Sequence, residues 1–144
     1  MVVYATDGRP LPRAIPTTQP YFDAAREGRL HLQRCPRDGV FFYPRSHCPD
    51  CWQSDWEWVD VSGRGEVYSF TIDRLGHDPA LAQDVPFVIA LVTLEEGARV
   101  VAKIIGCGVD DVTVGMPVEA TFESYTPADG GDAVALLRFR PRSE

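Results

Sequence analysis

The sequence is poor in lysine: its 144 residues include one, Lys103, and the formal net charge is −7. Basic and acidic residues cancel over residues 1–57, so that residues 58–141 carry the whole negative excess. A surface that follows a phosphate backbone needs clustered Lys and Arg side chains. The composition therefore argues against a nucleic-acid partner.

The sequence also lacks the long apolar run that a membrane-spanning helix requires. Residues 1–5 have neither the charged start nor the hydrophobic stretch of a secretory signal. Four cysteines are present, and three of them stand in two short turns, which favours metal binding in a reducing compartment over a disulfide framework. We expect a cytoplasmic protein that does not associate with membranes.

Motifs for catalysis are missing as well. The histidines His31, His47 and His77 are not spaced from a serine or cysteine in a recognisable nucleophile motif. A glycine-rich phosphate loop is also absent from the sequence. The sequence thus predicts no catalytic residue in this chain, and any enzymatic role would come from a larger complex.

What the sequence does contain is a pair of cysteine turns, Cys-Pro-Arg-Asp-Gly at 35–39 and Cys-Pro-Asp-Cys at 48–51. Each turn can aim two ligands at one point, and the segment between them has the length of a β-hairpin, which is the layout of a zinc ribbon. The predicted ligands are Cys35, Asp38, Cys48 and Cys51. Because Asp38 replaces a cysteine and its oxygen is a harder ligand than thiolate, we expect weaker binding and lower occupancy of zinc.

A zinc ion with four protein ligands is structural, whereas a catalytic zinc keeps an open position. A weak fourth ligand could leave such a position, with His47 or Asp50 acting beside it. A weakened structural site needs fewer assumptions and is our interpretation. The fourth cysteine, Cys107, follows an apolar run and is predicted to belong to the core.

The chain is predicted to be mainly β and to have three parts: an N-terminal arm and helix (1–29), a rubredoxin-like zinc-ribbon module (30–60) and a five-stranded OB-fold barrel (61–144). A proline-rich start predicts an extended arm, and aromatic residues at helical spacing predict a helix over 18–28. The aromatic face of that helix would pack on its own domain or on a partner. In the ribbon, one strand is expected at 30–34 and its return at 40–44.

The barrel is expected to follow Gly63-Arg64-Gly65, with strands at 66–73, 86–94, 99–107, 118–125 and 133–139. Short strands with a longer linker after the third are typical of an OB-fold. Residues 86–94 are apolar almost throughout, which predicts a strand covered on both faces. Residues 75–85 are long for a hairpin loop, and such loops are often functional. Within them His77 and Asp78 are candidates to reach a partner's active site, with a solvated polar loop as the alternative.

This combination resembles a family of bacterial and archaeal acyl-CoA-associated proteins made of a rubredoxin-like zinc ribbon and an OB-fold domain of unknown function. The residues that carry the resemblance are the turn ending in Asp38-Gly39, Tyr43-Pro44-Arg45 before the second turn, and residues 63–67 and 114–118. The resemblance implies an accessory subunit in a hetero-oligomer with a thiolase-like enzyme, either an acyltransferase or a retro-aldolase of lipid or steroid metabolism. It also implies that the partner holds the catalytic groups and that the zinc is structural.

The family further implies acyl-CoA as a ligand, which needs cations for its phosphates and a flat apolar surface for its adenine. The candidate contacts in the barrel are Arg64, Tyr68, Phe70, Arg74 and Lys103. One alternative function is a free-standing acyl-CoA-binding module. The other is an OB-fold nucleic-acid binder that stacks bases on its aromatic side chains, which the acidic barrel disfavours.

Overall fold

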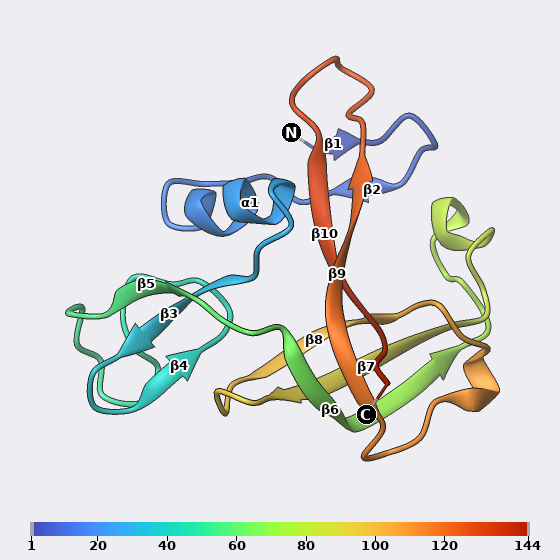
Figure 1. Ribbon diagram of the computed structural model, residues 1–144. Helices are drawn as coiled ribbons and strands as arrows, with labels where there is room; N and C mark the ends of the chain where they lie inside the picture. The colour runs from blue at the N-terminus through green and yellow to red at the C-terminus, as the bar shows by residue number, and fades with distance from the viewer. Residues whose placement is uncertain (1, 144) are drawn as a thin grey trace.

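The computed structural model describes residues 2–143, which form a closed barrel with a small three-stranded sheet beside it (Figure 1). Helix α1 (Gln19–Arg26) precedes the small sheet in the chain and packs against strands of both units. In the described part of the chain, no helix is long and apolar enough to cross a membrane.

The barrel consists of β6 (Arg64–Asp73), β7 (Phe87–Leu94), β8 (Arg99–Ile104), β9 (Pro117–Tyr125) and β10 (Val134–Pro141). The order around the barrel is β10-β8-β7-β6-β9, and β6 closes it by pairing with β9. Strand β10 runs parallel to β8, whereas the other pairs are antiparallel. This is the strand arrangement of an OB-fold, and it confirms the predicted fold class.

The seam between β8 and β10 is short, because only Arg138 and Phe139 pair there with Lys103 and Ile104. Helix α1 packs against β10 beside this seam, and side chains from α1, β8 and β10 line one shared cavity. Its aromatic residues Tyr21 and Phe22 belong to the same buried cluster as the barrel core. Of the two alternatives for the aromatic face of the helix, packing within the chain is therefore the correct one.

Strand β7 corrects one prediction. Its residues alternate, with Val88, Ala90 and Val92 buried while Ile89 and Leu91 are each 36% exposed. The expectation that 86–94 is covered on both faces is wrong for residues 2–143, because the outer face stays partly exposed at these two positions. The apolar pattern came from two apolar faces of which only one turns toward the core.

The small sheet contains β3 (His31–Cys35), β4 (Gly39–Phe41) and β5 (Glu57–Asp60) in the order β4-β3-β5. The first two lie where strands were expected, but the sequence analysis did not predict β5, which is held by its pairing with β3. In the structure Trp58 stacks on His31, with ring centroids 5.2 Å apart and planes at 7°. The cross-strand pair between β3 and β5 gives this short strand its position.

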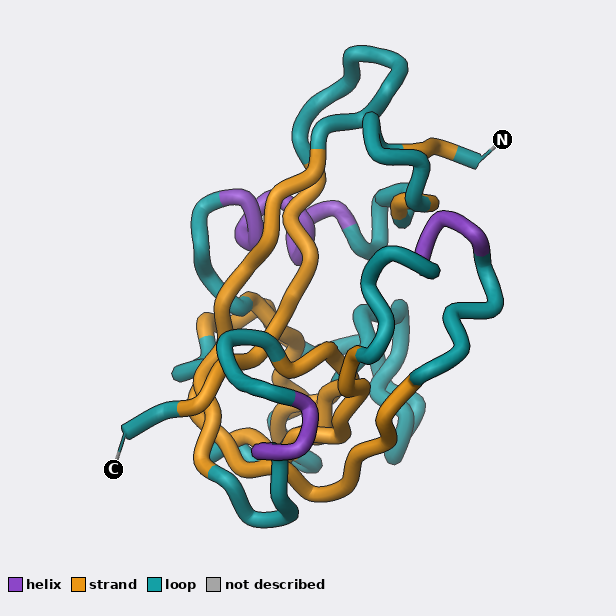
Figure 2. The backbone as a smooth tube through the Cα atoms, turned by 90° about the vertical axis from the view of Figure 1, so that its right-hand side faces the viewer, coloured by secondary structure: helices purple, strands orange, loops and turns teal. Residues whose placement is uncertain are grey.

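The proline-rich start is more ordered than an extended arm. Strands β1 (Val3–Tyr4) and β2 (Pro10–Leu11) form a hairpin that lies beside the loop between β9 and β10 (Figure 2). Backbone hydrogen bonds join it to that loop, from Thr6 to Thr126 (3.0 Å) and from Ala128 to Tyr4 (2.8 Å). The prolines prevent neither the hairpin nor its hydrogen bonds to the loop, because they stand at turns and edge positions.

Gly65 is placed where β6 pairs with both neighbours, with Leu94 on one side and Val118 on the other. A Cβ atom here would lie 2.5 Å from the carbonyl oxygen of Thr93 and 2.9 Å from Cγ1 of Val92. Glycine therefore permits a close approach of two backbones at the point where the barrel closes.

We expect Gly65→Ala to lower the free energy of unfolding by about 1–3 kcal/mol, because the added methyl group forces the backbone of β7 to shift. Urea unfolding followed by circular dichroism measures this change. Gly131→Ala is the control, since its Cβ would first meet the side-chain oxygen of Asp129 in an exposed loop. Equal midpoints for the two variants would show that the close approach at Gly65 is not needed.

Candidate metal centre

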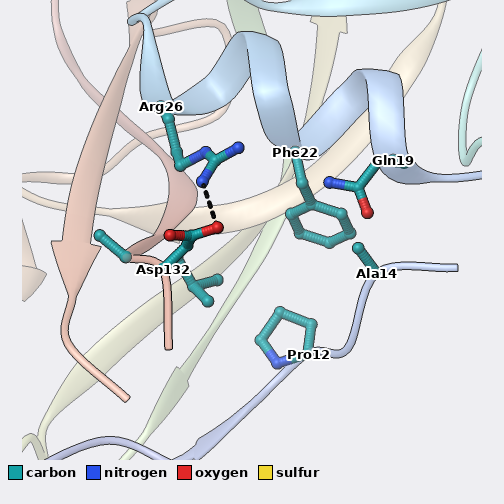
Figure 3. Close-up of a pocket in the computed structure, with 8 residues that line it drawn as sticks. Pro12, Ala14, Gln19, Phe22, Arg26 and Asp132 are labelled. Carbon is teal, nitrogen blue, oxygen red and sulfur yellow. Dashed lines mark ion pairs between the residues drawn. The ribbon is translucent and has the colours of Figure 1, made fainter. Parts of the chain in front are cut away.

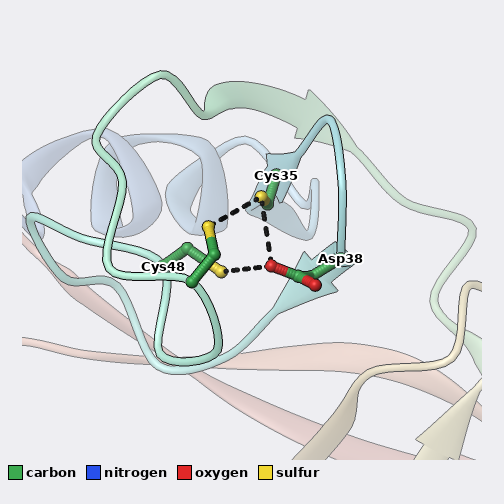
Figure 4. Close-up of side chains that lie close together, drawn as sticks. Cys35, Asp38 and Cys48 are labelled. Atoms are coloured by element: carbon green, nitrogen blue, oxygen red, sulfur yellow. Dashed lines mark hydrogen bonds between the residues drawn. The ribbon is translucent and has the colours of Figure 1, made fainter.

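The predicted metal ligands come together at one end of the ribbon. Cys35 and Asp38 flank the turn between β3 and β4, and Cys48 and Cys51 belong to the loop before β5. Their donor atoms all lie within 4.8 Å of one another. Figure 4 shows the side chains of Cys35, Asp38 and Cys48 directed toward a common point.

The spacing of these atoms fits a zinc ion. The sulfur atoms of Cys35 and Cys51 are 3.7 Å apart, and the Asp38 oxygen lies 3.6 Å from Cys35 Sγ and 3.4 Å from Cys48 Sγ. With Zn–S bonds of about 2.3 Å, the edge of a tetrahedral site is about 3.8 Å. These three separations are close to that edge, so the donor set can surround a zinc ion, and the thiols are free rather than joined in disulfides.

Backbone geometry holds each turn in shape. Gly39 has φ +84°, a conformation that glycine adopts without strain. In the second turn, the Trp52 amide donates to the Cys48 carbonyl and the Cys48 amide donates to the Gln53 carbonyl, both at 2.9 Å. The backbone thus supports the turn geometry that brings the donors together.

Gln33 fixes the second turn against the central strand. Its side chain is 1% exposed, and it donates from Nε2 to the Arg45 carbonyl at 2.7 Å while accepting from the Arg45 amide at 2.8 Å. A buried amide with both groups satisfied is a specific constraint on the loop. Sequence analysis did not identify this residue, since a polar residue in an alternating strand gives no sign of its partner.

The surroundings shift the pKa values of the donor groups in different directions. Hydrogen bonds from the thiols of Cys51 and Cys48 lower the pKa of Asp38, whereas desolvation raises the pKa of the Cys48 thiol to about 11. Arg37 donates to Cys51 Sγ at 3.5 Å and to both carboxylate oxygens of Asp55. With three thiolates and a carboxylate, a zinc ion would leave a net charge of −2, which this guanidinium partly offsets.

The alternative of a catalytic zinc gains no support from the neighbouring side chains. His47 forms a hydrogen bond of 2.9 Å with the Ser46 hydroxyl, and neither His47 nor Asp50 belongs to the cluster of donors. Four protein donors are already present, as in structural sites. The donor set therefore fits a structural zinc, whose chemical contribution is to hold the two turns together.

The structure does not bring the candidate acyl-CoA contacts to one place. Arg64 and Arg74 stand at and just beyond opposite ends of β6, where Arg64 pairs with Glu95 at 3.0 Å and Arg74 with Asp110 at 3.8 Å. Phe70 packs against the core, and the ring of Tyr68 lies under the guanidinium of Arg99 instead. That these residues contact CoA stays a prediction.

The remaining cation, Lys103, belongs to a polar network that the sequence did not reveal. Its ammonium group lies 3.5 Å from Asp84 and 4.0 Å from the centre of the Phe87 ring. Asp84 also accepts from Arg9 at 2.9 Å, which joins the N-terminal hairpin to the long loop after β6. A partner 75 positions away in sequence leaves no local signal.

His77 and Asp78 stand in the long loop after β6, where Asp78 accepts from the Ala80 amide at 2.9 Å and begins the short helix η1 (Pro79–Leu81). This turn chemistry explains the choice of Asp at that position. It neither requires nor excludes a contact with a partner, so the role of both residues stays a prediction.

The cavities of the structure differ in size, and one of about 350 Å³ lies at the polar network just described, where Arg9, Asp84 and Lys103 line it. Another lies between the N-terminal arm and α1, where Phe22 and Pro12 face each other and Arg26 reaches Asp132 at 3.6 Å (Figure 3). Its volume of about 210 Å³ is below the roughly 300–1,000 Å³ of ordinary ligand pockets. This cavity cannot enclose a molecule of the size of CoA.

Two family models match the chain. One, described as the ChsH2 rubredoxin-like zinc ribbon domain, matches residues 22–57, and the other, described as the ChsH2 C-terminal OB-fold domain, matches residues 58–123. Together they confirm the resemblance inferred from the two turns and the Gly-Arg-Gly start. The matched ribbon and its donor cluster also support the predicted structural zinc.

Individual relatives extend this result. The chain is 38% identical over 122 residues to a probable enoyl-CoA hydratase alpha subunit of Thermomonospora curvata, and the match covers 84% of this chain but only 36% of that protein. It is 30% identical over 128 residues to the benzoylsuccinyl-CoA thiolase subunit BbsA of Thauera aromatica, covering 83% of this chain and 82% of BbsA. The chain thus spans about a third of the hydratase subunit and most of the thiolase subunit.

Among solved structures, a chain of the Ltp2-ChsH2(DUF35) aldolase is similar over nearly its whole length. The TM-score is 0.73 at 33% identity, and the match covers 91% of this chain and 98% of the aldolase chain.

Asp38→Cys should raise zinc affinity by about tenfold or more, because a fourth thiolate is a softer ligand than a carboxylate oxygen. Competition with a chromophoric chelator measures the affinity of both proteins. Cys48→Ser is the matched variant in the other direction, and it should expose residues 30–57 to protease while the barrel stays resistant. If Asp38→Cys and the unmodified protein retain zinc equally well, Asp38 is not a zinc ligand.

Proposed function

The chain belongs to the ChsH2 family, whose members join a rubredoxin-like zinc ribbon to an OB-fold domain, and we propose that it is a non-catalytic accessory subunit of a thiolase-like acyl-CoA enzyme. In this proposal the partner is an acyltransferase or a retro-aldolase that holds the nucleophile and the acid–base groups. The accessory subunit completes the fold of the partner or its CoA channel. The hetero-oligomer works in the cytoplasm, where thiols stay reduced.

The observation that carries the proposal is the outer face of the barrel sheet. Leu91 pairs in register with Val101 on one side and Ser69 on the other, and Ile89 lies one outward position along β7. Of these, Val101 is 52% exposed and the two β7 side chains 36% each. Exposed apolar residues that adjoin one another mark protein–protein contact surfaces. We call Ile89, Leu91 and Val101 the outer apolar patch.

The patch continues toward the ribbon. Val101 also lines the cavity that contains Tyr21, Phe42 and Tyr43, and the single charged side chain among the lining residues is Arg138. Tyr21 and Arg138 are buried within the chain, so the part open to a partner is apolar and aromatic, with Tyr43 exposed and Phe42 half-buried, as in an interface core. Because the chain carries a net charge of −7, an area without acidic lining residues is a distinct feature of its surface.

A different protein fits this patch better than a second copy of the chain. Two copies would bring two net charges of −7 together, and self-repulsion of that kind opposes association. A larger subunit with a neutral or basic surface has no such cost. The names of the relatives, a thiolase subunit and an aldolase that contains a ChsH2 chain, support a thiolase-like partner.

In this proposal each of the three parts of the chain has its own role. The N-terminal arm and helix (1–29) hold the barrel seam, the ribbon (30–60) presents the metal-stapled turns, and the barrel (61–144) carries the outer apolar patch. His77 and Asp78 are our candidates to reach the partner's active site from the long loop.

Val101→Asp should weaken the complex with the thiolase-like chain by about tenfold or more, because it places a charge inside an apolar contact. The experiment is native mass spectrometry of the tagged protein from its own host, with the bound chain identified by peptide sequencing as thiolase-like. Val114→Asp is the control, since Val114 is 68% exposed and lies outside the patch.

Three results are informative. A complex that Val101→Asp disrupts and Val114→Asp retains supports the proposal and the patch together. If both variants retain the complex, the patch is not the contact surface, but the accessory function stands. An unmodified protein that carries a CoA ester and no second chain would replace the proposal with a free-standing acyl-CoA-binding module.

A further inference from the structure

Trp52 combines two features that are unfavourable for an isolated protein. It is 74% exposed, and its φ angle of +63° makes it the one non-glycine residue with positive φ within residues 2–143. A bulky side chain in the left-handed region is a backbone outlier. Exposure of a large indole ring to water adds a second cost.

The first turn of the ribbon provides an internal comparison. Both turns begin with Cys-Pro, and the residue after the second predicted ligand is Gly39 in one and Trp52 in the other. Both adopt positive φ, +84° and +63°. The backbone needs this conformation at Trp52, because its amide closes the turn on the Cys48 carbonyl. Glycine meets the same requirement without strain, so the indole is present for a reason other than the turn.

The aromatic and hydrogen-bond contacts of residues 2–143 do not explain the indole. Trp56 donates from its ring nitrogen to the Ser46 carbonyl at 2.8 Å, and Trp58 stacks on His31. Within residues 2–143, Trp52 has neither an aromatic partner nor a hydrogen bond from its ring. The other two tryptophans therefore stabilise the ribbon, and Trp52 faces outward from it.

We propose that Trp52 is an anchor residue that inserts into an apolar pocket on the partner subunit, an inference that rests on the accessory function proposed above. Tryptophan is among the residues most enriched at the energetic centres of protein interfaces. Because the ring sits on a turn stapled by metal ligands, its position is fixed before binding, and little conformational entropy is lost on contact.

The charges around the ring define the pocket it fits. Asp50 is exposed on the same loop, and the donor set with zinc carries a further negative charge, which Arg37, the ion-pair partner of Asp55, offsets only in part. This acidic environment disfavours a nucleotide or a nucleic acid as the ligand of the ring, because its phosphates would approach acidic groups. It favours a protein pocket with an apolar floor and lysine or arginine side chains at its rim.

Two substitutions separate the ring from the backbone strain. Trp52→Gly should raise the melting temperature by about 2–6 °C, since glycine relieves the strain, yet weaken the partner complex by about tenfold or more. Trp52→Ala also removes the ring but keeps a residue that is strained at positive φ, so it should bind the partner as weakly as Trp52→Gly without the gain in melting temperature. Zinc content and circular dichroism check that both variants fold.

The complex to be measured is that of the full chain with the co-purified thiolase-like subunit, titrated by native mass spectrometry. Equal loss of affinity in both variants, with a higher melting temperature only for Trp52→Gly, is the expected result. If the unmodified protein binds and both variants bind within twofold of it, the anchor role is overturned and the accessory function stands. If the unmodified protein itself forms no complex, the accessory function fails and the anchor role fails with it.

Discussion

The ribbon depends on the convergence of four side chains around one point, because it has almost no apolar core of its own. Its separate buried cluster contains only Cys35, Phe41 and Cys48, with Cys51 and Trp56 partly buried against them. Two of the three buried members are predicted metal ligands. Such a small cluster cannot offset the conformational entropy of ordering two turns and three strands, so the metal has to supply much of the difference.

This constraint reaches the barrel through β3. Leu30 and Leu32, at the start of that strand, belong to the barrel's buried cluster, whereas Cys35 at its end belongs to the ribbon's. The amide of Val61 donates to the Leu30 carbonyl at 3.0 Å and returns the chain toward the barrel. One strand therefore connects the two cores.

Features that depend on local spacing could be predicted from the sequence, whereas features that depend on contacts between distant segments could not. Each cysteine turn contains its own geometry, and alternation along β6 to β10 identifies strands, so the ribbon and the OB-fold could both be predicted. Strand β5 was missed because its position depends on pairing with β3, and the arm hairpin because it is held by a loop more than 100 residues away. The open outer face of β7 was missed for a related reason, since a pattern of apolar residues shows that both faces need cover but not which molecule provides it.

At the outer apolar patch and at Trp52, the residue type is unfavourable for its position in the isolated chain. In natural proteins such conflicts concentrate at functional positions. Alternation along a strand separates the two roles of these residues. Inward residues such as Val92 and Val100 form the barrel core, whereas their outward neighbours Leu91 and Val101 can change without altering that core. The part of the chain that is free to vary is therefore also the part that a partner would contact.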